Sequence, residues 1–139
     1  MAAGTIKIVA ALIRDDAGRV LLVRKRGTTA FMQPGGKREP GEDDIAALAR
    51  EIVEELGCCA VRASIQPLGE FDALAANEPG WRVQARLYGI DVTGDFAPNH
   101  EIDAMIWIDP AAPPDIPLAP LTRDHVLPLA SLGRVAGNA

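Results

Sequence analysis

The sequence predicts an α/β (α+β) domain in which strand-forming and helix-forming segments alternate along the chain. Three observations support this fold class. Short apolar segments recur between turn residues, one longer segment carries apolar residues at helical spacing, and neither pattern repeats as a larger unit. The length of 139 residues suits one domain with a buried core. We therefore expect residues 1–139 to fold as a single domain.

The N-terminal part of the chain predicts two strands joined by a turn. Residues 5–14 are apolar on both faces, which is typical of a strand in the centre of a sheet. The sequence Asp-Ala-Gly at 16–18 predicts a turn, so residues 19–25 are expected to return as the second strand of a hairpin. A loop at 27–30 and a short segment at 31–33 follow.

The segment 43–56 predicts an amphipathic helix that ends at Gly57, a residue typical of helix C-termini. Its apolar face is formed by residues at helical spacing: Ile45, Leu48, Ala49, Ile52 and Leu56. The carboxylates of Glu51, Glu54 and Glu55 share the opposite face, because they stand at i, i+3 and i+4.

The second half of the chain predicts three more strands. They are expected at 62–71, at 82–92 and at 104–109, and Pro67 marks a bulge or a sheet edge in the first of them. The turn-forming residues between the first two strands predict a loop at 72–81.

Prolines and a polar cap define the predicted C-terminal part. Five prolines at 110–120 predict an extended connection. Thr122 is expected to cap a helix that reaches about Leu132 and bends at Pro128. Residues 133–139 predict a frayed tail.

The three helix glutamates indicate a metal site. They lie in the last turns of the predicted helix, where negative charge opposes the helix dipole and like charges repel by roughly a few tenths of a kcal/mol each. An acidic face is also typical of a solvated surface. Here, however, Pro34-Gly35-Gly36 precedes the helix, and two glycines allow backbone to approach a ligand closely. Mg²⁺ or Mn²⁺ would suit a site of oxygen ligands.

The segment from Gly36 to Cys58 resembles the Nudix box. That pattern is Gly, five residues, Glu, seven residues, Arg-Glu, an aliphatic residue, any residue, Glu-Glu, any residue, Gly and an aliphatic residue. The matching positions here are Gly36, Glu42, Arg50-Glu51, Ile52, Glu54-Glu55 and Gly57. Cys58 replaces the last aliphatic residue and packs as a small hydrophobe. The order of predicted elements is also similar to the Nudix fold, a mixed β-sheet sandwiched between helices.

The resemblance implies a hydrolase that cleaves a pyrophosphate linkage in a nucleoside diphosphate derivative by attack of water on phosphorus. A divalent metal would neutralise the phosphates and activate water. The resemblance implies Glu51, Glu54, Glu55 and the Gly35 carbonyl as metal ligands. It leaves open whether one of these glutamates or a glutamate outside the box is the base. It also implies that Arg50 orients the carboxylates, that Glu42 supports the loop, and that Gly36 lies at the substrate.

Candidates outside the box carry weaker signals. Glu101 lies before a predicted strand, where relatives often place a further acidic ligand or base; it could equally be an exposed loop residue, and Glu70 is the alternative. Arg24 at the end of a predicted strand is a candidate for contacting substrate phosphate, ahead of Arg26, although such cations are often only solvated.

The strand at 82–92 and two aromatic residues could contribute to a substrate pocket. Arg82, Gln84, Arg86 and Tyr88 alternate onto one strand face, which would either line the pocket or meet water. Phe31 and Trp81 are candidates for stacking on a base, although aromatic residues commonly serve in packing.

The amino-acid composition limits the kinds of binding partner and the cellular location to be expected. The net charge of −5 argues against a binder of nucleic acid polymers, and we expect a small-molecule nucleotide as the partner. The adjacent Cys58 and Cys59 are poorly placed to bridge each other, which fits a reducing, cytoplasmic location. The apolar run at 8–13 ends in charged residues, so we expect neither a signal peptide nor a membrane anchor. A homodimer is left open.

The substrate is the least constrained part of the interpretation. By resemblance, a proline shortly after the box marks ADP-ribose hydrolases and a tyrosine marks dinucleoside polyphosphate hydrolases; residues 72–76 contain neither. This favours a nucleoside triphosphate that yields a nucleoside monophosphate and pyrophosphate. ADP-ribose or another nucleotide sugar is the alternative substrate. A module that binds nucleotide without cleaving it is a further alternative, although all box glutamates are present.

Overall fold

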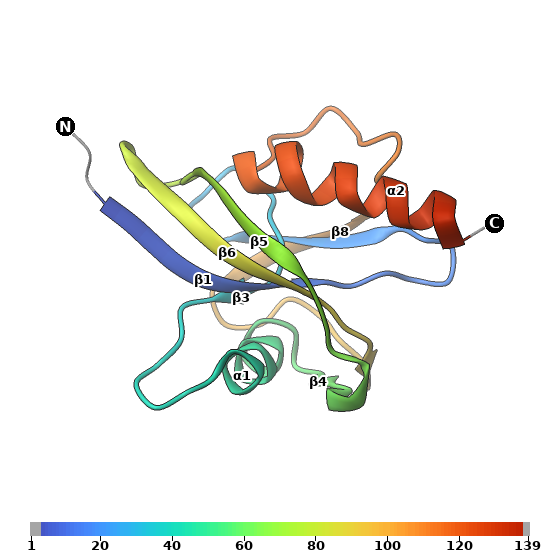
Figure 1. The fold of residues 1–139 in the computed structure, drawn as a ribbon, viewed down its shortest axis with the longest axis horizontal. Coiled ribbons are helices and arrows are strands. Elements are labelled where there is room, and N and C mark those ends of the chain that lie inside the picture. The colour runs from blue at the N-terminus through green and yellow to red at the C-terminus, as the bar shows by residue number, and fades with distance from the viewer. Residues whose placement is uncertain (1–3, 138–139) are drawn as a thin grey trace.

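The computed structural model describes residues 4–137, with side chains up to Leu132, and centres on a mixed four-stranded sheet (Figure 1). The order of strands in this sheet is β3 (Gly35–Gly36), β1 (Gly4–Leu12), β6 (Trp81–Gly89) and β5 (Gln66–Leu74). β1 is parallel to β6, whereas the other two pairings are antiparallel. The central position predicted for the first strand is confirmed, and a bulge between Pro67 and Gly69 lies in edge strand β5.

Two smaller sheets complete the strands. β2 (Val20–Lys25) pairs antiparallel with β8 (Ile102–Ile108), and β4 (Cys59–Ala60) pairs with β7 (Val92–Thr93). The hairpin predicted for residues 5–25 is therefore wrong beyond its turn, where Arg14 forms an isolated bridge to Val20. The physical reason is that β1 is already paired with β3 and β6 on its two sides, so β2 finds its partner in β8.

Helix α1 (Asp44–Leu56) matches the predicted helix within one residue. Asp43 caps its N-terminus by accepting a hydrogen bond from the Ala46 N–H at 2.8 Å. At the other end Gly57 adopts φ 74°, and its N–H donates to the Val53 carbonyl. The two caps fix where the helix begins and ends, and therefore which residues its carboxylate face presents.

The strand boundaries in the second half of the chain differ from the sequence-based ones. Residues 62–64 form a short 3₁₀ helix, and β5 runs on to Leu74 because it pairs with β6 up to Leu74–Arg82. The loop predicted at 72–81 is therefore shorter. The strand predicted at 82–92 ends at Gly89, and the one predicted at 104–109 is β8 at Ile102–Ile108.

The C-terminal helix begins earlier and ends later than predicted. Helical backbone starts at Pro120, passes through a π-helical segment (Thr122–Val126) and continues as α2 (Leu127–Gly137). Thr122 is not its cap. The π-helical segment precedes Pro128, which has no N–H for an α-helical bond. The tail predicted as frayed is helical up to Gly137, and residues 138–139 lie outside the described residues.

The core has two parts, one on each face of the four-stranded sheet. Val9 and Ala11 of β1 pack in a cluster with Leu48 and Ile52 of α1. The alternate β1 residues Ala10 and Leu12 pack in the second cluster, with residues of the C-terminal helix such as Val126 and Leu127. Helices α1 and α2 thus cover opposite faces of the sheet (Figure 1), which confirms a mixed sheet sandwiched between helices.

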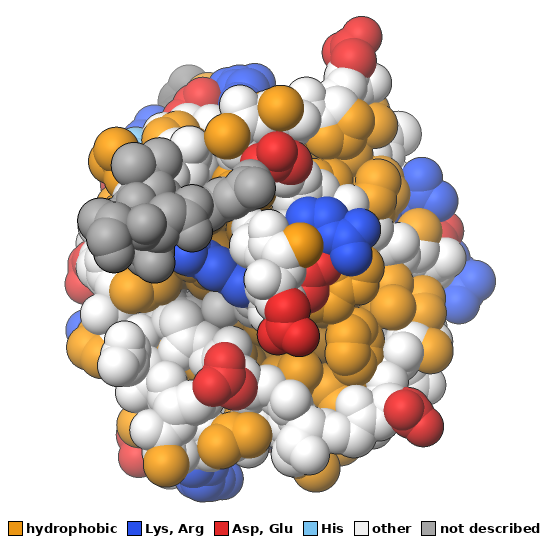
Figure 2. Space-filling view, turned by 90° about the vertical axis from the view of Figure 1, so that its right-hand side faces the viewer, with side chains coloured by type: hydrophobic (Ala, Val, Ile, Leu, Met, Phe, Trp, Pro, Cys, Tyr) orange, Lys and Arg blue, Asp and Glu red, His pale blue; other side chains and the backbone are white. Residues whose placement is uncertain are grey.

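The surface at the end of the molecule where α2 terminates is mixed in character. Hydrophobic side chains form much of this face, and acidic and basic side chains lie among them individually (Figure 2). Within residues 4–137, no helix is both long enough and apolar enough to cross a lipid bilayer.

Candidate active site

The carboxylates predicted on one face of α1 lie at the glycine pair of β3. Glu55 is 2 % exposed, and its Oε1 accepts a hydrogen bond from the Gly35 N–H at 3.1 Å. The Glu51 carboxylate lies against Gly36, where an added Cβ atom would stand 1.9 Å from Glu51 Oε2. Glu54 is closer to solvent, with 47 % of its side chain exposed. The three carboxylates therefore range from buried to half-exposed at one edge of the sheet.

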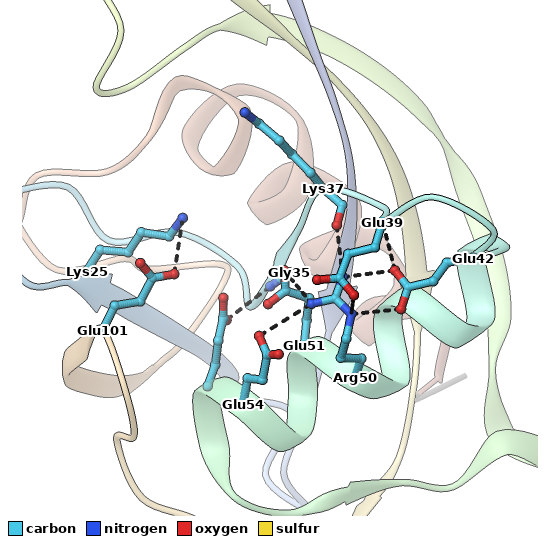
Figure 3. A network of polar contacts seen from close by, with 10 residues as sticks. Lys25, Gly35, Lys37, Glu39, Glu42, Arg50, Glu51, Glu54 and Glu101 are labelled. Atoms are coloured by element: carbon cyan, nitrogen blue, oxygen red, sulfur yellow. Dashed lines mark hydrogen bonds and ion pairs between the residues drawn. The ribbon is translucent and has the colours of Figure 1, made fainter.

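Arg50 connects the loop before α1 to the helix carboxylates (Figure 3). Its guanidinium donates to both carboxylate oxygens of Glu42, at 2.7 and 3.0 Å, and to the Lys37 carbonyl at 3.0 Å. It also donates to Glu54 at 3.3 Å, the pairing that the i+4 spacing allows. The hydrogen bonds with Arg50 lower the pKa of Glu42, and those with Glu42 raise the pKa of Arg50 above its usual range. Arg50 and Glu42 together hold the loop and helix in register.

Burial and mutual repulsion change the acidity of two helix carboxylates. Burial, followed by the nearby charge of Glu51, raises the pKa of Glu55 to about 8. Burial also raises the pKa of Glu51 to about 6, against the lowering effect of Arg50 and with a further upward contribution from Glu54. The charged forms of Glu51 and Glu55 are therefore unfavourable here unless a proton or a cation binds to them.

The donor set of this cluster fits a hard divalent cation. Mg²⁺ and Mn²⁺ prefer carboxylate and carbonyl oxygens, and a bound cation would offset the repulsion among Glu51, Glu54 and Glu55. Within the described part of the chain, no three acidic, histidine or cysteine side chains enclose an ion as they stand. Metal binding would therefore draw the carboxylates closer together than they stand here.

Glu101 lies across a hollow from the helix carboxylates. The residues that line this hollow are Glu54, Glu55, His100 and Glu101. The Glu101 side chain is 62 % exposed, and its Oε1 stands 3.9 Å from Lys25 Nζ (Figure 3). Its charge contributes to the raised pKa of both Glu51 and Glu55. The structure thus brings this residue, which is distant in sequence, to the carboxylates of the box.

A cavity of about 400 Å³ extends from the box over the α2 side of the sheet. Its floor is aliphatic and consists of alternate β1 residues and one residue of β6: Ile6, Ile8, Ala10 and Val83. Charged residues also line it, among them Lys25, Lys37, Arg38, Arg50 and Glu51. Its remaining lining comes from the β5–β6 loop, from Met32 and Gln33, and from the start of the C-terminal helix. The cavity and the carboxylate helix therefore meet at β3.

The chain is similar to known proteins over most of its length. The family model described as NUDIX domain matches residues 5–130. The chain belongs to this family. The expected identification as a Nudix hydrolase and the Nudix fold are therefore confirmed.

Relatives of this Nudix domain include proteins that match most of its length. It is 34 % identical to the CTP pyrophosphohydrolase of Escherichia coli over 122 residues, which cover 83 % of this chain and 84 % of that protein. It is also 34 % identical to the 8-oxo-dGTP diphosphatase of Haemophilus influenzae, over 48 % of this chain and 52 % of that protein. The crystal structure of the MutT NUDIX hydrolase from Burkholderia pseudomallei superposes with a TM-score of 0.72 at 26 % identity, covering 92 % and 96 % of the two chains.

Several candidates from the sequence lie away from the cavity of this Nudix domain. Arg24 pairs with Asp103 at 3.1 Å and stacks on the Phe31 ring at 5.3 Å, so it is absent from the cavity lining. Lys25, the next residue, lines the cavity instead, because successive residues of a strand face opposite ways. Glu70 pairs with Arg86 at 3.5 Å and is not part of the carboxylate hollow.

The polar face of β6 contacts neighbouring acids. Arg86 donates to Asp44 at 3.2 Å, and the Tyr88 hydroxyl also donates to Asp44. Arg82 donates to Asp72 at 3.1 Å. The strand contributes Val83, from its opposite face, to the cavity. These polar side chains therefore tie β6 to α1 and β5.

The sequence interpretation missed several residues that line the cavity. Lys37 and Arg38 follow the glycine pair directly, so their position in the chain could have indicated them. Gln33 and Thr122 gave no such signal, because they are far apart in sequence and meet only in the folded protein. Neither of the two aromatic candidates, Phe31 and Trp81, appears in the cavity lining. Phe31 packs against the α2-side cluster instead.

Proposed function

We propose that this protein is a Mg²⁺- or Mn²⁺-dependent pyrophosphohydrolase that converts a nucleoside triphosphate into a nucleoside monophosphate and pyrophosphate. The observation that carries the proposal is the meeting of two features at β3. The carboxylate face of α1 lies at Gly35 and Gly36, and the cavity begins at the second of these glycines, Gly36. A substrate with an apolar, planar end and a polyphosphate end matches this combination.

The glycine pair allows a substrate to span both features. Gly36 has no side chain where it meets Glu51, so a phosphate that approaches this part of the backbone would also lie beside the Glu51 carboxylate. The aliphatic floor of the cavity would then cover one face of the base, and the charged end would hold phosphates. In this arrangement the bridging phosphates lie nearest the helix carboxylates, which favours release of pyrophosphate.

Basic residues at the charged end of the cavity offset the acidity of the protein. The chain carries a net charge of −5, so its overall field repels a triphosphate. Lys25, Lys37 and Arg38 line the cavity and supply local positive charge for phosphate oxygens. Lys25 replaces Arg24 as the candidate for this role, because Lys25 lines the cavity and Arg24 does not.

The residues that would hold the metal are Glu51, Glu54, Glu55 and the Gly35 carbonyl. When bound, the metal would neutralise phosphate charge and lower the pKa of a water molecule. Arg50 keeps Glu54 and the loop carbonyl of Lys37 in fixed positions around it. The base that accepts the proton of the attacking water is either a box glutamate or Glu101, which is largely exposed and faces the same hollow.

Similarity to triphosphate-cleaving relatives supports the choice of substrate. The Escherichia coli relative is named for CTP, and the Haemophilus influenzae relative for 8-oxo-dGTP; both names denote nucleoside triphosphates. The first of these matches most of both chains, and its match includes more than the box.

Product analysis tests the proposal. Purified protein would be incubated with Mg²⁺ and a panel of nucleoside triphosphates, ADP-ribose and nucleotide sugars, and the phosphate products separated. We expect pyrophosphate and nucleoside monophosphate from triphosphates, and no turnover with a chelator. Glu54→Gln should lose nearly all turnover, whereas the control Glu70→Gln, outside the hollow, should retain it. Orthophosphate as the sole primary product would contradict the proposal, and activity on ADP-ribose alone would assign the alternative substrate.

A further inference from the structure

The amide of Gln33 is only half satisfied in the folded protein. Gln33 is 6 % exposed, and its Oε1 accepts a hydrogen bond from the Thr122 hydroxyl at 2.9 Å. Its Nε2 is buried and has no hydrogen-bond partner, and it is the one such side-chain atom found among the described residues. Buried polar atoms are nearly always paired, so this nitrogen requires an explanation.

One end of this amide is held by a buried partner. Thr122 is fully buried at the start of the C-terminal helix and holds Gln33 Oε1, so the two N–H donors of Gln33 are left for another group. A methionine or leucine would fill a buried position of this size without the unpaired amide nitrogen, although the hydrogen bond with Thr122 would be lost. The unpaired nitrogen itself lowers stability, unless its free donors serve a ligand.

Both residues of this pair line the cavity. Gln33 and Thr122 belong to its lining together with Ala119 and Leu121, whose side chains are aliphatic. Gln33 precedes Gly35 by two residues, roughly 7 Å in an extended chain. Gln33 and Gly36 line the same cavity, so one nucleotide bound in it can contact both.

We propose that Gln33 determines base specificity by donating a hydrogen bond from Nε2 to an acceptor of the nucleobase, either a carbonyl oxygen or a ring nitrogen. The inference rests on the proposed function and extends it to the identity of the base. Thr122 acts as a positioning residue, because its hydroxyl holds one end of the amide and leaves the other end free for the base. Since the nitrogen is shielded as the side chains stand, the arriving base displaces the neighbouring aliphatic side chains slightly.

The test compares kcat/KM across triphosphates that differ only in the base. In Gln33→Met, kcat/KM for the preferred base should fall by about 10- to 100-fold, the effect of losing one hydrogen bond to a buried donor. Values for the poorest base should change little, so that selectivity is lost. The melting temperature without nucleotide should change little, because removal of the unpaired donor is offset by loss of the hydrogen bond that Gln33 accepts from Thr122. A purely structural glutamine would change the melting temperature and leave selectivity intact.

Two further variants keep the test decisive. Thr122→Val retains the shape of the side chain and should reduce selectivity in the same direction but less strongly. Gln84→Met is the matched control, because Gln84 alternates onto the opposite strand face from the cavity residue Val83; its selectivity should equal that of the wild type. Unchanged selectivity in both Gln33→Met and Thr122→Val would overturn the inference while the proposed function stands. Absence of any nucleotide hydrolysis by the wild type would overturn both.

Discussion

At the residue scale, the buried carboxyl of Glu55 has the most unusual environment in the proposed site. It is almost inaccessible to solvent, and a backbone N–H of β3 is the hydrogen-bond donor found for it. That single bond lowers its pKa, but burial and the charge of Glu51 outweigh it. Without metal, the folded state therefore favours the protonated form of Glu55 near neutral pH.

This environment predicts how the stability of the metal-free protein depends on pH. The unfolded chain loses the Glu55 proton near the ordinary pKa of 4.5, whereas the folded protein keeps it to about 8. The contribution of the protonated Glu55 to the free energy of unfolding is therefore fully present below the pKa of the unfolded chain. It is lost as pH rises through the pKa of the folded protein. In chelator, the melting temperature should fall from roughly pH 5.5 to 8.5, and Glu55→Gln should flatten this fall. A wild-type melting temperature that rises over this range would contradict the assignment.

Glu101 provides a second prediction at this scale. Its side chain is largely exposed and its contact with Lys25 is long, so removing its charge should alter stability little. If it is a metal ligand or the base, Glu101→Gln should lower kcat by roughly 100-fold or more. Steady-state rates and thermal melts of this variant, beside Glu70→Gln, decide the question. Near wild-type turnover would make Glu101 an ordinary loop residue.

At the scale of single elements, the two glycines of β3 have different physical requirements. Gly35 adopts φ 151°, and an added Cβ would stand 2.1 Å from the Val9 carbonyl oxygen. Gly36 has no positive φ, and the atom that an added Cβ would meet belongs to the flexible end of Glu51. The first glycine is therefore required by the backbone, and the second by the position of a carboxylate.

This difference predicts opposite outcomes for two alanine substitutions. Gly35→Ala should destabilise the fold by at least about 3 kcal/mol, because backbone atoms cannot move aside. Gly36→Ala should cost about 1 kcal/mol, since Glu51 can turn away, but it should lose most activity and metal binding because that carboxylate is displaced. Denaturant unfolding and Mn²⁺ binding measured on both variants test the contrast. Equal losses of stability would show that Gly36 is also a backbone requirement.

The loop before α1 was also partly predictable from sequence. The box residues Glu42, Arg50 and Glu54 come together because one helix and the loop leading into it hold them, so their spacing was sufficient. Asp44 is the first residue of α1, where an acidic residue is favourable. In the structure it also accepts hydrogen bonds from Arg38, Arg86 and Tyr88, and so joins α1 to β6. A local sequence pattern does not indicate hydrogen-bond partners that come from a distant strand.

At the scale of the whole molecule, metal should stabilise the fold. The folded state gathers carboxylates that the unfolded chain separates, so a divalent cation binds it preferentially. Adding Mg²⁺ should raise the melting temperature by several degrees, and Glu54→Gln should lose most of that gain while remaining folded. Glu70→Gln should respond as the wild type does. An equal gain in Glu54→Gln would place the metal elsewhere.

The whole-molecule arrangement shows where sequence reasoning stops. The apolar run of β1 and the helical face of α1 could be recognised as local patterns, whereas the arrangement in layers was expected only from the resemblance to the Nudix fold. The pairing of β2 with β8 and the contact between Gln33 and Thr122 depend on segments far apart in the chain. Their partners are set by competition among strands and by packing across the sheet, which a single sequence does not record.

The brevity of β3 has a consequence for how such a protein can change over evolutionary time. β3 has only two residues, so the carboxylate face of α1 and the cavity meet over a short stretch of chain. Elsewhere α1 and the α2 side of the cavity lie on opposite faces of the sheet. Mutations at Leu121 or Thr122 can therefore reshape the cavity while the packing of the carboxylate helix remains unchanged. Specificity for new substrates could arise by substitutions on one side of the sheet, while the carboxylate face of α1 stays the same.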